Sequence, residues 1–129
     1  MKPCILFVCG RNKWRGPTAE RLYRNDNRIE VRSAGTSNKS RHQLSRADIE
    51  WADLILVMER KYGFWIRLQF RDLILPPIQS LDIPDEYQFM DEELTELIQS
   101  SVEYHIRQLI RIEVRRLDES TRSKSDASA

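Results

Sequence analysis

The feature that most constrains the fold is a fourfold alternation of short apolar runs with helical patterns. The apolar runs are rich in β-branched and aliphatic residues, which is typical of strands, and they cover residues 4–8, 29–33, 54–58 and 78–83. A helical pattern follows each run. This alternation predicts an α/β fold, a three-layer doubly wound sandwich in which helices cover both faces of a four-stranded parallel sheet.

The expected helices carry recognisable start signals. Pro17 suits a first helical turn, and the segment from Ser45 to Asp48 has the spacing of a capping box. A third helix is expected over residues 59–72. Asp91 can cap the last helix, whose apolar residues recur every four positions and are Leu94, Ile98, Val102, Ile106 and Ile110.

Chain length and composition limit the organisation and the class of partner. With 129 residues, 40% of them hydrophobic, we expect one domain over residues 1–117 and a disordered polar tail over 118–129. Lys and Arg number 21 against 20 Asp and Glu, so the net charge favours neither a nucleic acid nor a membrane as partner. The chain lacks a long apolar run and a signal-peptide pattern, which predicts a cytoplasmic protein.

The loop that follows the first expected strand carries the chemistry. It reads "CGRNKWRGP" over residues 9–17 and joins a buried strand to a helix start, where backbone N–H groups gather around an anion. Cys9 stands at the positive end of the helix beside basic side chains, which favours the nucleophilic thiolate. Arg15, six residues on, can hold two oxygens of a phosphoryl group in its planar fork. Cys4 and Cys9 lie too far apart on one strand for a disulfide, so both are expected as free thiols.

The loop resembles that of the low-molecular-weight protein-tyrosine phosphatases, which follows the pattern Cys-x5-Arg-Ser-Pro-x-Ala-Glu. The resemblance extends to "RSAGT" (32–36), "WADLILVMER" (51–60) and, more loosely, "IPDEYQFMDEEL" (83–94). It implies an aryl-phosphate phosphomonoesterase that works through a phosphocysteine on Cys9, with no metal and no cofactor. Its substrate would be a phosphotyrosine protein or a small aryl phosphate, and phosphate, sulfate or vanadate would inhibit it.

The resemblance also implies roles for particular residues. The phosphate would be bound by Gly10, Arg11, Asn12, Lys13, Trp14 and Arg15. Asp85 is the expected general acid, with Asp82 as the alternative. Asn12, Ser33 and His42 would hold the loop in shape. Trp14 and Tyr87 would form the pocket wall.

The sequence departs from the family pattern in ways that keep other functions open. Gly16 replaces the serine or threonine whose hydroxyl steadies the thiolate, so the chain could instead be a weak or inactive phosphate-binding pseudophosphatase. An arsenate reductase is the third alternative, but it needs a resolving thiol, and Cys4 is the only other cysteine. The segment between residues 36 and 57 is also shorter than usual, which predicts a more open side of the sheet.

Overall fold

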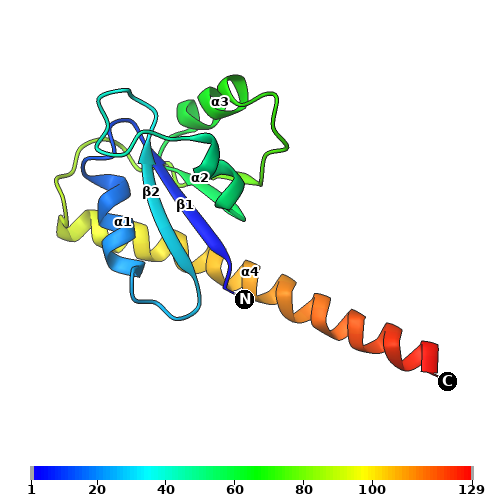
Figure 1. Ribbon diagram of the computed structural model, residues 1–129. Helices are drawn as coiled ribbons and strands as arrows, with labels where there is room; N and C mark the ends of the chain where they lie inside the picture. The colour runs from blue at the N-terminus through cyan, green and yellow to red at the C-terminus, as the bar shows by residue number, and fades with distance from the viewer. Residues whose placement is uncertain (1, 129) are drawn as a thin grey trace.

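The computed structural model describes the backbone of residues 2–128 and the side chains of residues 2–121. Its elements, in chain order, are β1 (Cys4–Cys9), α1 (Arg15–Tyr23), β2 (Glu30–Gly35), α2 (Arg46–Trp51), β3 (Leu54–Val57), α3 (Arg60–Gln69), β4 (Ile78–Ser80) and α4 (Glu92–Ser128). The strands pair in parallel in the order β2-β1-β3-β4, and helices connect successive strands along the chain (Figure 1). The predicted α/β fold with a four-stranded parallel sheet is confirmed.

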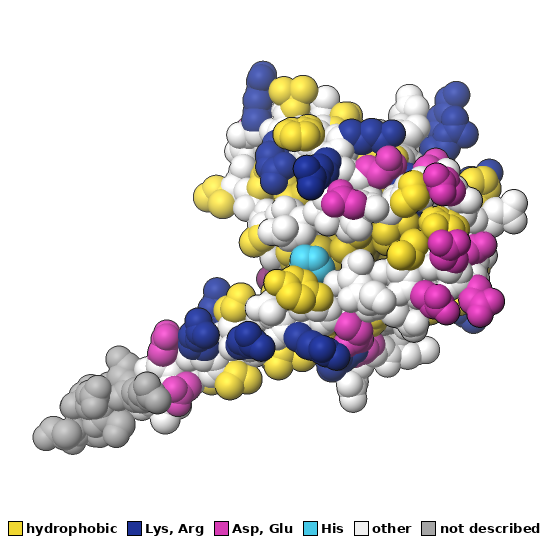
Figure 2. Space-filling model, turned by 180° about the vertical axis from the view of Figure 1, so that it is seen from behind, with side chains coloured by type: hydrophobic (Ala, Val, Ile, Leu, Met, Phe, Trp, Pro, Cys, Tyr) yellow, Lys and Arg dark blue, Asp and Glu magenta, His cyan; other side chains and the backbone are white. Residues whose placement is uncertain are grey.

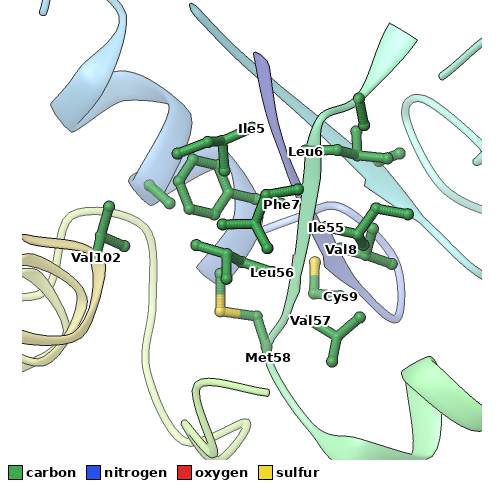
Figure 3. Packing of buried hydrophobic residues seen from close by; sticks show 14 of the residues in the cluster. Ile5, Leu6, Phe7, Val8, Cys9, Ile55, Leu56, Val57, Met58 and Val102 are labelled. Carbon is green, nitrogen blue, oxygen red and sulfur yellow. The ribbon is translucent and has the colours of Figure 1, made fainter. Parts of the chain in front are cut away.

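β1 is the centre of the hydrophobic core and ends at the loop of interest. Its neighbours on the two sides are β2 and β3, and residues 5–9 are buried. A parallel strand covered on both faces has no solvent-facing side, which explains its continuous apolar sequence. Phe7 of β1 and Leu56 of the neighbouring β3 pack together in this core, and Cys9 is the last residue of β1 (Figure 3). The sheet therefore places the Cys9 thiol at its carboxyl edge, where ligands bind in folds of this class.

Local signals position two of the helices. Ser45 caps α2, and its side chain and that of Asp48 form the reciprocal pair of a capping box, as predicted. α1 begins at Arg15, two residues before Pro17, so the proline sits in the first turn, where its missing N–H costs no helical hydrogen bond. The helix start thus fixes Arg15 directly beside the loop.

α4 closes the core with one face and then extends beyond it. The predicted stripe is buried from Leu94 through Ile106, whereas Ile110 is exposed. From there the helix projects away from the body and carries both hydrophobic and Lys or Arg side chains (Figures 1 and 2). The expectation of a disordered tail over 118–129 differs from the structure, in which α4 continues to Ser128. No Gly or Pro interrupts residues 92–128, and this allows the helix to continue without core contacts. Among the described residues, no helix combines the length and the apolar character needed to cross a membrane.

Candidate active site

The loop from Cys9 to Arg15 is held from below by the segment that follows β2. Thr36 N–H donates to the carbonyl of Cys9, and Ser37 N–H donates to the carbonyl of Gly10. Within the described part of the chain, the amide N–H groups of residues 11–14 donate to no partner. The carbonyls of Cys9 and Gly10 are therefore engaged, and a row of amide donors is left available, as an anion-binding nest requires.

Two residues, Asn12 and Gly35, allow the backbone of the loop to approach the end of β2 closely. Asn12 adopts a left-handed conformation with φ of 52°, which asparagine tolerates better than most residues. A Cβ added to Gly35 would overlap the Ser40 side chain and lie 2.8 Å from the amide nitrogen of Asn12. Gly35 is therefore required where β2 and the loop meet.

Asn12 and Ser33, two of the residues expected to support the loop, lie together behind it. Asn12 Nδ2 donates to the carbonyl of Ser33 over 3.5 Å, and Ser33 Oγ donates to Glu20 Oε1 over 2.7 Å. Both side chains are buried. Glu20 is a further member of this support that the sequence reasoning missed.

The loop encloses a cavity of about 290 Å³ at the end of β1. Its lining comprises Cys9, Gly10, Arg11, Lys13, Trp14, Arg15, Ser37, Tyr62 and Asp85. The expected phosphate-binding residues all line it except Asn12, which lies behind the loop. The structure therefore brings the expected nucleophile, arginine and acid to one cavity.

Arg15 is clamped by partners from two other segments. Its Nη1 donates to Glu59 Oε2 and to the carbonyl of Ile83, both at 2.7 Å, and its Nη2 donates to Tyr62 Oη at 3.0 Å. Burial alone would lower the pKa of Arg15, but the hydrogen bonds to Glu59 and Tyr62 raise it above its usual value. Burial likewise opposes ionisation of Glu59, yet its bond to Arg15 and the positive charge of Arg15 hold the pKa of Glu59 below its usual value.

This clamp leaves one edge of the guanidinium for a ligand. Glu59 Oε2 accepts from Arg15 Nη1, and Tyr62 Oη accepts from Arg15 Nη2. Tyr62 Oη also donates to Glu59 Oε2 over 3.2 Å, so the two acceptors lie side by side at the Nη1–Nη2 end of Arg15. The opposite Nε–Nη2 edge faces Asp85, whose Oδ1 lies 3.7 Å from Nε. A planar guanidinium fixed in this way presents two parallel N–H donors, the geometry that matches two phosphoryl oxygens. Glu59 and Tyr62, which create it, were not identified as site residues from the sequence.

The two candidate acids lie in different surroundings. Asp85 lines the cavity, and its side chain is 62% exposed, so it can reach a bound molecule. Asp82 adopts a left-handed backbone with φ of 53°, accepts a hydrogen bond from Ser80 Oγ at 2.7 Å and pairs with Arg60. Asp82 does not line the cavity around Cys9. Of the two candidate acids, only Asp85 lies at the cavity that contains Cys9.

His42 and Tyr87 do not lie where the sequence reasoning expected them. His42 Nε2 lies 2.8 Å from Asp48 Oδ2 and is outside the support formed by Asn12 and Ser33, because the short loop after β2 directs it toward α2. Tyr87 packs against the hydrophobic core, where its ring buries apolar surface. The aromatic walls of the cavity are Trp14 and Tyr62.

Gly16 packs closely beside the Cys9 thiol. A Cβ at this position would lie 3.3 Å from Cys9 Sγ and 3.1 Å from Asn12 Oδ1. Among the described residues, that buried Oδ1 has no hydrogen-bond partner. A side chain at position 16 would therefore lie next to both the sulfur and an unpaired acceptor, and the glycine offers a hydroxyl to neither.

Cys4 lies at the opposite end of β1 from Cys9, and both cysteines are free. Cys4 does not line the cavity. In the described part of the chain, no group of three or more His, Cys, Asp and Glu side chains is arranged to hold a metal ion.

Comparison with known proteins gives structural matches only. No protein-family model matches the sequence, and no curated protein matches it. SP-PTP, a low molecular weight protein tyrosine phosphatase from Streptococcus pyogenes, superposes with a TM-score of 0.71 at 19% identity, over 84% of this chain and 93% of that one. YfkJ from Bacillus subtilis matches with a TM-score of 0.67 at 19% identity, covering 86% of this chain and 96% of its own.

A third solved structure, the YwlE arginine phosphatase from Geobacillus stearothermophilus, matches with a TM-score of 0.62 at 24% identity, over 90% of this chain and 96% of that one. These three matches each cover more than nine tenths of the other chain, so the likeness includes the whole domain. They confirm the resemblance drawn from the loop sequence at the level of the fold. The chain therefore has the fold of the low molecular weight protein tyrosine phosphatases.

Proposed function

We propose that the chain is a cysteine-dependent phosphomonoesterase that hydrolyses aryl phosphates such as phosphotyrosine through a phosphocysteine on Cys9. The observation that carries the proposal is the common cavity, which joins the Cys9 thiol, the unused loop amides, the clamped Arg15 and Asp85. Solved structures of the same fold support it, because they include tyrosine and arginine phosphatases and a Wzb tyrosine phosphatase in complex with sulphate.

In the first step, the Cys9 thiolate attacks phosphorus while the loop amides and the Nε–Nη2 edge of Arg15 bind the equatorial oxygens. The bond between phosphorus and the leaving aryl oxygen breaks, and Asp85 donates its proton to that oxygen. Fixed donors aimed at the developing charge lower the barrier most, and the Glu59 and Tyr62 clamp keeps Arg15 in place for this purpose.

In the second step, water attacks the phosphocysteine, and the Asp85 carboxylate accepts a proton from it. The bond between sulfur and phosphorus breaks, the electron pair returns to Cys9 as thiolate, and inorganic phosphate leaves. Gly16 bears on this step, since residue 16 lies beside the departing sulfur and supplies no hydroxyl.

The rim of the cavity favours an anionic, aromatic substrate. Trp14 and Tyr62 offer aromatic surfaces to an aryl group, and Arg11 and Lys13 place positive charge around the opening. This charge would repel the guanidinium of phosphoarginine, so we expect phosphotyrosine and aryl phosphates to be preferred to phosphoarginine.

A phosphate-binding pseudophosphatase is the second candidate, and Gly16 is the observation that favours it. A missing donor at such a site can be worth about 2–4 kcal/mol, or a loss of a hundredfold or more in rate. Such a protein would keep the anion-binding loop and lose turnover.

A substrate panel separates the two functions. Phosphotyrosine, phosphoserine and phosphoarginine peptides, small aryl phosphates and nucleoside monophosphates are incubated with the full chain, and released phosphate is measured. The matched control is Cys9→Ser. Release from aryl phosphates above this control supports the phosphatase, whereas vanadate binding with no release from any substrate establishes the pseudophosphatase.

A further inference from the structure

A second cavity, of about 610 Å³, lies between α1, β2 and the loop that follows β2. β2 is an edge strand, and in Figure 1 α1 lies beside it with this loop above. The cavity shares Asn12 with the catalytic loop but includes none of Cys9, Arg15 and Asp85. It is therefore separate from the candidate active site.

The charged side chains around this cavity are predominantly basic. Arginines 21, 24, 32 and 41 line it together with two carboxylates, Glu20 and Asp48. Both carboxylates are engaged, Glu20 by Ser33 and Asp48 by His42. In contrast, the side chains of Arg21, Arg24 and Arg41 have no hydrogen bond or ion pair to any residue that the structure describes. Four arginines thus line the cavity against two carboxylates, one of which pairs with Arg32, so the lining carries an excess of positive charge.

The arrangement of the arginines keeps this charge concentrated. Arg21 lies in the last turn of α1 and Arg24 is the C-cap of this helix, three residues on, a spacing at which like charges repel each other. The guanidinium of Arg32 stacks on the ring of Trp51 at 4.3 Å and lies 3.7 Å from Asp48 Oδ1, which fixes its position. An anion bound between these side chains would relieve the repulsion and engage several guanidinium forks at once.

We propose that this cavity binds a small polyanion with two or more phosphate groups. The arginines that line the cavity come from α1 and its C-cap, from β2 and from the following loop, so a ligand with several phosphate groups can engage more of them than a single phosphate. The volume lies within the range of about 300–1,000 Å³ that is usual for small-molecule sites. Arginine is also the residue best suited to phosphate, because its donors match two oxygens.

The test is a nuclear magnetic resonance titration of the ¹⁵N-labelled full chain at fixed physiological ionic strength. Inorganic tripolyphosphate is the first probe, and ATP is the second, so that the relative affinities tell whether the cavity takes the free chain or its organic ester. We expect saturable shifts of the Nε–Hε signals of Arg21, Arg24 and Arg41. The amide signals of residues 10–15 report the candidate active site separately.

Variants locate the site. Arg21→Gln with Arg24→Gln should raise the Kd for tripolyphosphate by roughly tenfold or more, since two charge-assisted contacts are removed. Arg67→Gln with Arg71→Gln, which removes the same charge from outside the cavity, should leave the Kd unchanged. Arg41→Gln, in the loop that follows β2, should also raise the Kd for tripolyphosphate, and it leaves α1 unchanged.

Shifts confined to residues 10–15, or an unchanged Kd in the cavity variants, would overturn the proposal. The titration measures binding and needs no turnover. Its outcome therefore stands apart from the proposed phosphatase activity.

Discussion

Replacing Glu59 by glutamine tests the clamp on Arg15. Glu59 Oε2 accepts from Arg15 Nη1 at 2.7 Å, and the two side chains are 29% and 3% exposed. Removing one partner of a fully buried pair costs about 3–5 kcal/mol, whereas exposed pairs contribute about 0–1 kcal/mol. The Arg15–Glu59 pair is intermediate in burial, because Arg15 is buried and Glu59 is partly exposed. In Glu59→Gln, the amide oxygen can still accept one hydrogen bond from Arg15. We therefore expect Glu59→Gln to lower the free energy of unfolding by roughly 1–3 kcal/mol at neutral pH.

The same contact makes a prediction about pH. The pKa of Glu59 is held below its usual value by Arg15, although burial opposes this. A carboxyl with a lowered folded-state pKa stabilises the protein fully above its unfolded pKa of about 4.3 and loses that contribution as the pH falls through the folded value. The difference in stability between wild type and Glu59→Gln should therefore be constant above about pH 5 and shrink below about pH 4.

Urea unfolding of both proteins across this pH range measures the effect. Glu50→Gln is the matched control, because Glu50 is exposed and forms only a surface ion pair with Arg46. We also expect kcat/KM for an aryl phosphate to fall in Glu59→Gln at neutral pH, since the Arg15 fork loses its restraint. A stability difference that is the same at pH 3 and pH 7, or no larger than that of Glu50→Gln, would refute the reasoning.

Three further predictions concern the chemistry. Cys9→Ser should abolish hydrolysis and keep vanadate or phosphate binding, whereas Cys4→Ser should change neither in phosphate-release and binding assays; turnover in Cys9→Ser would contradict the mechanism. Gly16→Ser should shorten the phosphocysteine lifetime in rapid-quench measurements, because its hydroxyl contacts the departing sulfur, and Gly16→Ala controls for the added Cβ; equal lifetimes in the two variants would show that the hydroxyl has no role. Asp85→Asn should cost about 10²–10⁴-fold with an alkyl phosphate and much less with an activated aryl phosphate, and Asp82→Asn should cost little with either; the opposite pattern would make Asp82 the acid.

The sheet and the catalytic loop could be predicted because their signals are local. Residues 4–17 contain a buried strand, a nucleophile, an arginine and a helix start within one continuous stretch. Each part of that stretch is recognisable by itself, and together they specify where the anion binds. The capping box at Ser45 was predictable for the same reason.

The clamp on Arg15 could not be predicted, because it depends on contacts between distant parts of the chain. Glu59 and Tyr62 lie 44 and 47 residues from Arg15 in sequence. Their residue types are also compatible with an ordinary helix start. Only the parallel pairing of β1 with β3 brings the two segments to the same edge of the sheet.

The structure places His42, Tyr87 and the C-terminal segment differently from the sequence expectations, for different physical reasons. The loop around His42 is short, and Asp48 offers this side chain a buried carboxylate. Tyr87 can bury its ring against the core. The polar run after Leu117 lacks an apolar anchor but also lacks a helix breaker, so composition alone does not exclude the helix that the structure describes up to Ser128.

The most direct test of the proposed mechanism is the detection of a phosphoryl group on Cys9. The full chain is mixed with an activated aryl phosphate, quenched on the millisecond scale under conditions that preserve phosphocysteine, and digested for mass spectrometry. We predict a gain of one phosphoryl group on the peptide that contains Cys9, with its formation coincident with the burst of released phenol. The gain should be absent in Cys9→Ser and longer-lived in the wild type than in Gly16→Ser. Aryl phosphate hydrolysis with no phosphoryl group on Cys9 at any quench time, or with the phosphoryl group on another residue, would contradict the mechanism.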